Sequence, residues 1–239
     1  MGENSKSIWL GYDSREVDAF VVAVESLKRH NSENIRAKGI LLHDQINLEN
    51  YYRPYRKIQN TLFDEISQAA MSTEFALTRF LTPLLAQTGW ALFCDCDVLF
   101  RSEISELFNS ADQRYAVQVV KHQHTPAETT KMDNQIQQPY PRKNWSSVML
   151  FNCDHPSNKK LTLDLINSKR GRDLHAFCWL EDDEIGELNL EWNYLEGYST
   201  ETIDPKIVHF TLGTPLMPGH KDSQHSAEWM EVLYKWARN

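Results

Sequence analysis

The sequence predicts an α/β fold in which a mixed, mainly parallel central sheet is flanked by helices. Short apolar runs typical of buried strands alternate with stretches of helical periodicity along the chain. The 239 residues are 41% hydrophobic, enough to bury the core of one large domain. We therefore expect a single domain over residues 1–239, with its ligand at the carboxyl ends of the strands.

The chain opens with a strand, a helix and a second strand. Residues 8–12 are apolar and end in a turn, and Asp13 with a glutamate three residues later is typical of a helix N-cap. Apolar residues at helical spacing run from residue 17 to residue 30, and residues 39–43 form the second predicted strand. This pattern predicts a β–α–β unit.

The rest of the chain is less regular. Residues 44–72 are polar and tyrosine-rich, so no element is predicted there, whereas residues 73–87 have helical spacing and precede a strand at 91–94. Further strands and a closing amphipathic helix are predicted at residues 116–120, 148–152, 207–210 and 226–238. Residues 121–146 are polar and contain three prolines, and a connection of this length predicts a lid or binding loop that orders on ligand binding.

Composition narrows the classes of partner. A net charge of −8 disfavours nucleic acid and anionic membranes, which require a basic surface. The sequence contains neither a signal-peptide pattern nor an apolar run of about 18 residues, so we expect a cytoplasmic protein without a membrane span. The four cysteines form no CxxC pair and are expected to be buried, reduced thiols. No pattern indicates an oligomeric state.

Two carboxylates stand in an otherwise apolar stretch. Asp95-Cys96-Asp97 lies within residues 90–100, whose other members are all apolar or thiol-bearing. Burying an unpaired carboxylate costs several kcal/mol, so the pair requires a cation, an arginine or a turn that returns it to water. In an extended segment both carboxylates point to one face, about 6 to 7 Å apart.

Three interpretations of the pair are open. The aspartates could cap a turn, form the nucleophile motif of a haloacid-dehalogenase-type phosphatase, or bind Mg²⁺ or Mn²⁺ together with a diphosphate. The phosphatase motif normally follows the first strand and has threonine or valine where this chain has Leu99. A DxD after a complete β–α–β unit favours a sugar-nucleotide transferase, with the phosphatase as the alternative.

Motifs before and after the pair stand in a characteristic order. They are Tyr12-Asp13 after the first strand, Arg79 before the acidic pair, Asp95-Cys96-Asp97, the strand Trp145 to Asn152, Asp183-Glu184 followed by Leu188 and Trp192-Asn193, and His209 with Gly213 and Pro215. This order resembles the retaining GT-A glycosyltransferases of family 8, which include bacterial galactosyltransferases and glycogenin-like proteins.

The resemblance implies a GT-A fold with a nucleotide-binding part at about 7–100 and an acceptor-side part at about 101–239. It implies transfer of a glycosyl unit, with retention, from a nucleoside-diphosphate sugar, expected to be UDP-linked, to a hydroxyl of a glycan or another acceptor. The residues that it implies are the metal ligands Asp95, Asp97 and His209; the donor contacts Tyr12, Asp13, Arg79, Asp95 and Cys96; and the catalytic residues Asp183, Glu184 and Arg79, with Asp182 as the register alternative to Asp183.

The chain also departs from the family pattern. Trp145 and Ser147 stand where the family has asparagine and glycine, and Glu184 replaces the usual glutamine. The lysine and tryptophan of the ending H-x-x-G-x-x-K-P-W have no counterpart after His209. These departures keep open a catalytically silent domain that binds a sugar nucleotide or glycan.

Each site residue also has a purely structural interpretation. His209 could be a hydrogen-bonded core histidine, and Asp13 could be only a helix cap worth about 1 kcal/mol. Arg79 could pair with a surface carboxylate. The acidic run at residues 181–184 could be a solvated turn, as charge clusters usually are.

Overall fold

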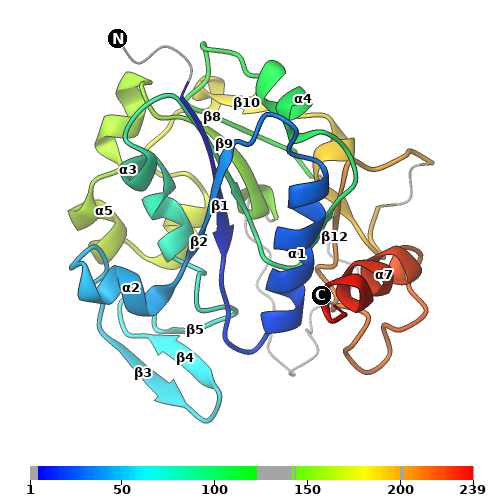
Figure 1. Ribbon diagram of the computed structural model, residues 1–239. Helices are drawn as coiled ribbons and strands as arrows, with labels where there is room; N and C mark the ends of the chain where they lie inside the picture. The colour runs from blue at the N-terminus through cyan, green and yellow to red at the C-terminus, as the bar shows by residue number, and fades with distance from the viewer. Residues whose placement is uncertain (1–4, 123–141, 143, 200–201, 239) are drawn as a thin grey trace.

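The computed structural model describes residues 5–122, 142, 144–199 and 202–238. At its centre is a six-stranded sheet in the order β10-β8-β9-β6-β1-β2 (Figure 1). Its strands are β1 (Lys6–Gly11), β2 (Arg36–Ile40), β6 (Trp90–Cys94), β8 (Val117–Val119), β9 (Val148–Asn152) and β10 (Ile185–Glu187). Only β9 runs antiparallel to its neighbours, which confirms the predicted mixed, mainly parallel sheet.

Two smaller sheets accompany the central one. One joins β11 (Tyr194–Leu195), β12 (Ile207–His209) and β7 (Val98–Phe100), and the other is the antiparallel meander β3 (Tyr55–Ile58), β4 (Thr61–Asp64) and β5 (Ala69–Met71). Because β7 follows β6 after three residues, the chain passes there from the central sheet into the β11-β12-β7 sheet.

Helices cover both faces of the central sheet. The α-helices are α1 (Val17–Arg29), α2 (Leu42–Asn47), α3 (Thr82–Ala86), α4 (Ile104–Asn109), α5 (Leu163–Ser168), α6 (Gly171–His175) and α7 (Ser226–Trp236). The 3₁₀ helices are η1 (Thr78–Leu81), η2 (Trp145–Ser147), η3 (Pro156–Lys160), η4 (Asp182–Glu184) and η5 (Leu190–Asn193). None of the described helices is both long enough and apolar enough to cross a membrane.

The core follows the two-residue period of the strands. Trp9 and Phe93 pack with side chains of η1, α5 and α6 on one face, whereas Ile8 and Leu92 pack with side chains of α1 and α4 on the other. A third cluster places Trp229 of α7 against α1 and β12. Each of the two sheet-face clusters contains residues from before and after residue 100.

Several predicted bounds need correction. The second strand ends at Ile40 rather than residue 43, and α2 begins at Leu42. The unassigned stretch 44–72 contains the β3-β4-β5 meander, in which all four residues of β3 are exposed. With no buried face, β3 has no alternation to detect. The predicted lid at 121–146 lies mostly outside the described residues.

The helix predicted at 73–87 is shorter than expected. Residues 73–77 form turns, and helical structure begins with η1 and continues as α3. Pro83 has no N–H with which to bond the carbonyl of Arg79, and the Thr82 hydroxyl donates to that carbonyl instead, at 2.7 Å. The apolar spacing therefore reflects burial rather than one continuous α-helix.

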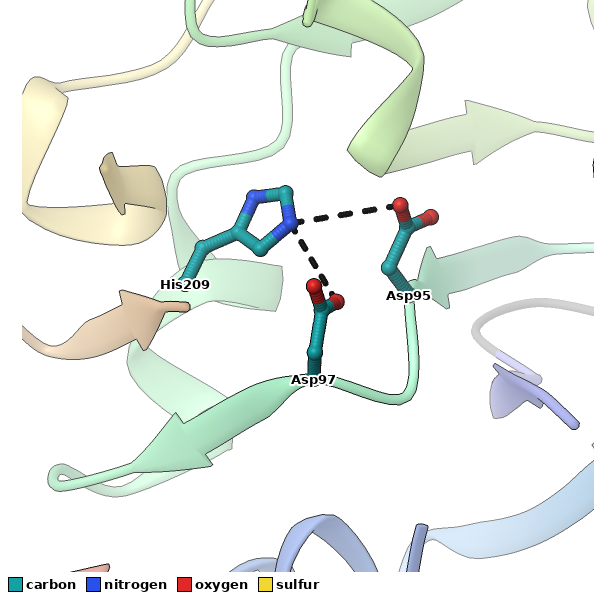
Figure 2. A group of neighbouring side chains, drawn as sticks. All are labelled: Asp95, Asp97 and His209. Atoms are coloured by element: carbon teal, nitrogen blue, oxygen red, sulfur yellow. Dashed lines mark ion pairs between the residues drawn. The ribbon is translucent and has the colours of Figure 1, made fainter. Parts of the chain in front are cut away.

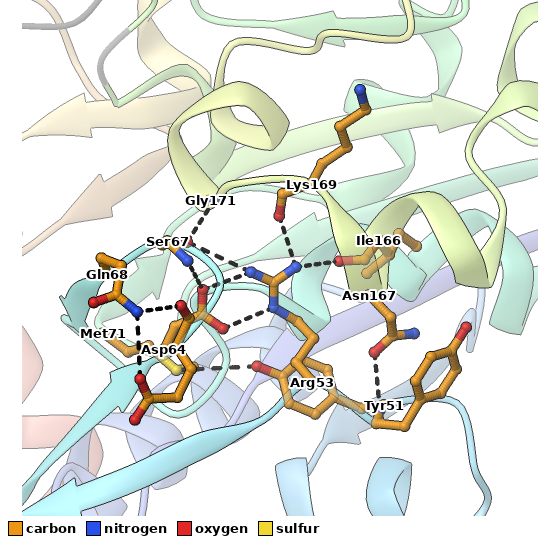
Figure 3. A network of polar contacts seen from close by, with 12 residues as sticks. Tyr51, Arg53, Asp64, Ser67, Gln68, Met71, Ile166, Asn167, Lys169 and Gly171 are labelled. Carbon is orange, nitrogen blue, oxygen red and sulfur yellow. Dashed lines mark hydrogen bonds and ion pairs between the residues drawn. The ribbon is translucent and has the colours of Figure 1, made fainter.

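A buried ion pair attaches the meander to the body of the protein (Figure 3). Arg53 donates to both oxygens of Asp64, at 2.9 and 2.5 Å, and both side chains are almost fully buried. The same guanidinium donates to the carbonyls of Ile166 and Lys169, both at 2.7 Å. The pair thus fixes the end of α5 and the connection that leads into α6.

Candidate active site

Asp95-Cys96-Asp97 forms the turn that joins the two sheets. The Asp95 amide donates to Ser147 O at 2.9 Å and extends the β6–β9 pairing, while the Asp97 carbonyl accepts from Phe210 N at 2.9 Å and extends the β7–β12 pairing. The buried Cys96 side chain packs into the core between them. The segment is therefore a turn at the end of the predicted strand, and the spacing given above for an extended segment does not apply to it.

The turn directs both carboxylates toward His209 at the end of β12 (Figure 2). His209 Nε2 lies 3.2 Å from Asp97 Oδ1 and 4.0 Å from Asp95 Oδ2. One potential ligand atom from each residue lies within 4.8 Å of the others. His209 is also buried and bonded to Asn193, so it satisfies the core interpretation while its second nitrogen faces the carboxylates.

The donor set suits a hard divalent cation. Asp97 Oδ1 is buried and accepts no well-aligned hydrogen bond among the described residues, so its contact with His209 Nε2 at 3.2 Å leaves it free to bind a cation. Mg²⁺ binds oxygen ligands at about 2.1 Å in an octahedron, so adjacent ligands lie about 3 Å apart. Two carboxylates and one imidazole at these separations would therefore fit Mg²⁺ or Mn²⁺ after small adjustments.

Burial and mutual repulsion shift the protonation of the cluster. Burial, followed by the charge of Asp97, raises the pKa of Asp95 to about 6 despite the nearby Arg79. Burial also acts to raise the pKa of Asp97, but His209 beside it lowers that pKa below its usual value. Burial acts to lower the pKa of His209, whereas the two carboxylates raise it above its usual value. The cluster therefore attracts positive charge, either a proton or a metal.

Arg79 supplies a cation within this group. Its Nη1 donates to Asp95 Oδ1 and to Ser146 O, each at 2.8 Å. The guanidinium lies over the rings of Phe75 and Phe93 and is 4% exposed, so the surface-pair interpretation is wrong. Arg79 holds Asp95 through Oδ1, whereas His209 lies nearer to the other carboxylate oxygen, Oδ2.

Tyr12 and Asp13 follow β1 at the same edge of the sheet. The ring of Tyr12 packs edge-on against Phe20, with centroids 5.1 Å apart. Asp13 does not cap α1, because Glu16 occupies the N-cap position. Instead, Asp13 Oδ1 and Oδ2 accept from the fork of Arg15 at 2.9 and 2.7 Å, so this aspartate orients an arginine.

Glu16 is a further carboxylate near the turn. It accepts a hydrogen bond from the Cys96 thiol, with a sulfur–oxygen distance of 3.6 Å. Burial, together with the charges of Asp97 and Asp13, raises the pKa of Glu16 to about 7. The thiol of Cys96 therefore faces Glu16 and the core, although the sequence predicted it as a donor contact.

A cleft opens beside the β1–α1 connection. Ser14 and Arg15 line one side, and Lys57 and Asn60 of the meander line the other, with Glu74 among the remaining residues. Its lining combines two cations, the carboxylate of Glu74 and neutral hydrogen-bonding groups, which suits a polar ligand.

Asp183 and Glu184 lie away from this group. They belong to η4, which precedes β10, and β10 runs in the same direction as β6. They therefore stand at the opposite edge of the sheet from Asp95. Asp183 is exposed, and Glu184 completes a capping box by accepting from Glu181 N at 2.8 Å. The register alternative Asp182 is also exposed and pairs with Arg142.

His175 and Ser146 form a polar pair that adjoins Arg79. His175 Nδ1 lies 2.7 Å from Ser146 Oγ, and the His175 ring packs edge-on against Phe80. Because Ser146 O accepts from Arg79, this pair lies two contacts from Asp95. Ser146 lies in a motif that was recognised, but His175 lies 29 residues later in no recognised motif, so only the fold reveals the pair.

The profile of glycosyl transferase family 8 matches residues 7–214, which include the turn, Arg79 and His209. The chain belongs to glycosyl transferase family 8. This family 8 chain is also 40% identical over 235 residues to Protein CDI of Arabidopsis thaliana, covering 96% of this chain and 86% of that protein. Membership excludes the phosphatase alternative and identifies the chain as a member of a glycosyltransferase family.

Solved structures share the fold at low identity. The bifunctional glycosyltransferase WbbM matches at 14% identity and a TM-score of 0.61, and the galactosyltransferase LgtC at 13% and 0.59. GlyE of Streptococcus pneumoniae TIGR4 matches at 16% and 0.56. At least 96% of the family 8 chain aligns with each, spanning half of WbbM, 64% of GlyE and 95% of LgtC. These likenesses confirm the GT-A fold.

Proposed function

We propose that this protein transfers a glycosyl unit from a nucleoside-diphosphate sugar, UDP-linked, to a hydroxyl of a glycan or another acceptor, with retention of configuration. The observation that carries the proposal is the Asp95–Asp97–His209 cluster with its unsatisfied Asp97 oxygen, at the carboxyl edge of the sheet. Family membership supports the reaction class.

Each group has a task in this proposal. Asp95, Asp97 and His209 would hold Mn²⁺ or Mg²⁺, whose charge would stabilise the diphosphate as it leaves. Arg79 holds Asp95 in position and adds positive charge beside it. The nucleoside would lie along Tyr12 and the cleft beside Arg15, which would leave the region of residues 101–239 for the acceptor.

We further propose that His175 and Ser146 face the donor sugar. Both are polar, they bond each other at 2.7 Å, and the carbonyl of Ser146 accepts from Arg79. A sugar requires hydroxyl and imidazole partners of this kind for orientation.

The first test removes one carboxylate. Asp97→Ala should abolish Mn²⁺-dependent binding of UDP, measured by calorimetry, and turnover of UDP-sugars, because the cluster loses the oxygen that has no other partner. Asp204→Ala is the matched control, since Asp204 is exposed and pairs with Arg101 at the far end of β7. Unchanged metal-dependent UDP affinity in Asp97→Ala would overturn the metal site.

The same calorimetry separates the remaining alternative. If the protein is a catalytically silent domain, the wild type will bind UDP in the presence of Mn²⁺. It will, however, neither hydrolyse nor transfer the sugar of any UDP-sugar offered. The lysine missing after His209 motivates this second candidate.

A second test compares the two ends of the sheet. His175→Ala should lower kcat for UDP-sugar turnover by about 10²-fold while leaving Mn²⁺ affinity within about twofold, because it removes one positioned hydrogen-bonding group. Asp183→Asn should leave both kcat and Mn²⁺ affinity within about twofold, because Asp183 is exposed at the opposite edge. The reverse pattern would restore the acidic run as the catalytic element.

A further inference from the structure

We propose that Asn193 and Ser147 are positioning residues that fix which nitrogen of His209 carries the proton, and thereby prepare the other nitrogen to bind the cation. The inference rests on the proposed function only in that it concerns the same metal site. It assigns a task to Ser147, which stands where the family pattern has glycine.

Four groups form a continuous chain of hydrogen bonds behind the cluster. Ser147 Oγ donates to Asn144 O at 2.8 Å, and Asn193 Nδ2 donates to Ser147 Oγ at 2.9 Å. Asn193 Oδ1 lies 3.1 Å from His209 Nδ1. Asn193, Ser147 and His209 are 0%, 4% and 3% exposed, so bulk water does not compete for these contacts.

We call these four hydrogen-bonded groups the relay. Their donors and acceptors can be assigned in only one consistent way. A hydroxyl has a single proton, and Ser147 gives its proton to a carbonyl that can only accept. Ser147 must therefore accept from its other neighbour, and within Asn193 only the amide NH₂ can donate. The carbonyl oxygen of Asn193 is then turned toward His209.

The direction sets the tautomer of His209. An amide oxygen pairs with a ring N–H and not with a ring lone pair, so Nδ1 carries the proton. In the neutral ring, the lone pair of Nε2 then faces Asp97 Oδ1 at 3.2 Å and Asp95 Oδ2 at 4.0 Å. These lone pairs repel unless a proton or a metal ion lies between them, so the relay leaves Nε2 as the nitrogen on which a metal ion replaces a proton.

Ser147 is the member of this relay in which the protein departs from the family pattern, which has glycine there. Without its hydroxyl, the Asn193 amide could rotate by half a turn and present NH₂ to His209, which would favour the proton on Nε2. A metal would then have to displace that proton before binding. The serine therefore links the start of β9 to the chemistry of β12, 62 residues later in sequence.

The test reads the tautomer without metal or donor. In protein labelled with ¹⁵N-histidine, long-range proton–nitrogen correlation NMR distinguishes a protonated Nδ1 from a protonated Nε2, and His209→Gln identifies the signal. At a pH above the pKa of His209, where the ring is neutral, the wild type should show protonated Nδ1 and unprotonated Nε2. Ser147→Ala and Asn193→Leu should shift His209 toward protonated Nε2, and should weaken Mn²⁺ binding measured by calorimetry, Asn193→Leu by about 10- to 100-fold.

Asn158→Leu is the matched control. Asn158 is equally buried and bonds three partners, Ala116 O, Asn152 O and Trp179 Nε1, at a distance from the cluster. It should lose stability yet keep the His209 tautomer and the Mn²⁺ affinity of the wild type. If Asn193→Leu does not fold, Ser147→Ala carries the test alone.

The outcomes separate the relay from the proposed function. Protonated Nε2 in the wild type, or an unchanged tautomer and Mn²⁺ affinity in both variants, would overturn the relay while leaving UDP-sugar transfer untouched. Conversely, a wild type with protonated Nδ1 that binds Mn²⁺ through His209 but turns over no UDP-sugar would support the relay and contradict the transferase.

Discussion

Two opposing effects act on the protonation state of Asp95. Burial raises its pKa to about 6, yet Arg79 and a bound cation both require the ionised form. In the metal-free protein, the protonation of Asp95 therefore contributes most to the free energy of unfolding at low pH. This stabilising contribution is lost as the pH rises through about 6. Above that pH, ionised Asp95 depends on Arg79 and on a bound cation for its stabilisation.

Mn²⁺ affinity should therefore fall as the pH is lowered. A proton and the metal compete for Asp95, and the raised pKa of His209 adds a second competing proton in the same direction. Below about pH 6, each unit should weaken binding by about tenfold per competing proton. Calorimetry at pH 7.5, 6.5 and 5.5 measures this dependence, and an affinity that did not change over that range would contradict the assignment of Asp95 as a ligand.

At the scale of elements, the meander depends on two ion pairs of opposite character. Arg53 and Asp64 pair in the interior, whereas the neighbouring pair of Arg56 with Glu65 is largely exposed. A buried guanidinium that loses its carboxylate is left uncompensated, whereas exposed partners are rehydrated. The two pairs therefore provide an internal comparison.

Asp64→Ala should lower the free energy of unfolding by about 3 to 5 kcal/mol. Glu65→Ala should lower it by no more than about 1 kcal/mol, because exposed pairs contribute little. Urea denaturation of both variants measures the difference. If the two variants were equally stable, the interior pair would not hold the meander against the α5–α6 connection.

Elements with one buried face could be predicted from the sequence. β9 and α1 follow their apolar patterns closely, and the acidic turn was visible because two charges interrupt apolar residues. The exposed strand β3 and the Pro83-interrupted helix were not predictable in this way, since exposure removes periodicity and a proline alters a helix without changing its apolar spacing.

Some of the candidate site residues could likewise be predicted from the sequence, and others could not. Asp95, Asp97 and His209 were predicted together because unusual residue types stand at strand ends, and the structure brings these three side chains together. The sequence did not indicate the contact of His175 with Ser146, and it gave no sign that Asp183 and Glu184 lie at the opposite edge of the sheet, because that depends on which sheet edge a segment reaches. Local sequence does not encode that edge, and the direction of β10 decides it.

At the scale of the whole molecule, the ligand cluster joins two sheets. Asp95 continues the central sheet, and His209 lies in the sheet formed with β7 and β11. A cation held by both would be a cross-link between segments more than 100 residues apart in sequence. Such a link resists separation of the two sheets in addition to serving chemistry.

Saturation with Mn²⁺ should therefore stabilise the fold at this junction. At a concentration 100 times Kd, the gain should be about 2.7 kcal/mol, and amide hydrogen exchange should slow in β7 and β12. Hydrogen-exchange mass spectrometry with and without Mn²⁺ measures the effect, and His209→Ala should abolish it. Slower exchange confined to segments remote from the turn would contradict the cross-link.

The reversed direction of β9 has a consequence for how such a protein can diversify. Because β8 ends and β9 begins at the edge that carries Asp95, the connection between them leaves and returns beside the cluster. Insertions or deletions between the two strands change the length of this connection without shifting the register of a single strand. If the proposed transfer takes place here, the length of this connection can change acceptor specificity while Asp95 and His209 stay in place, so it is the natural place to graft a new specificity.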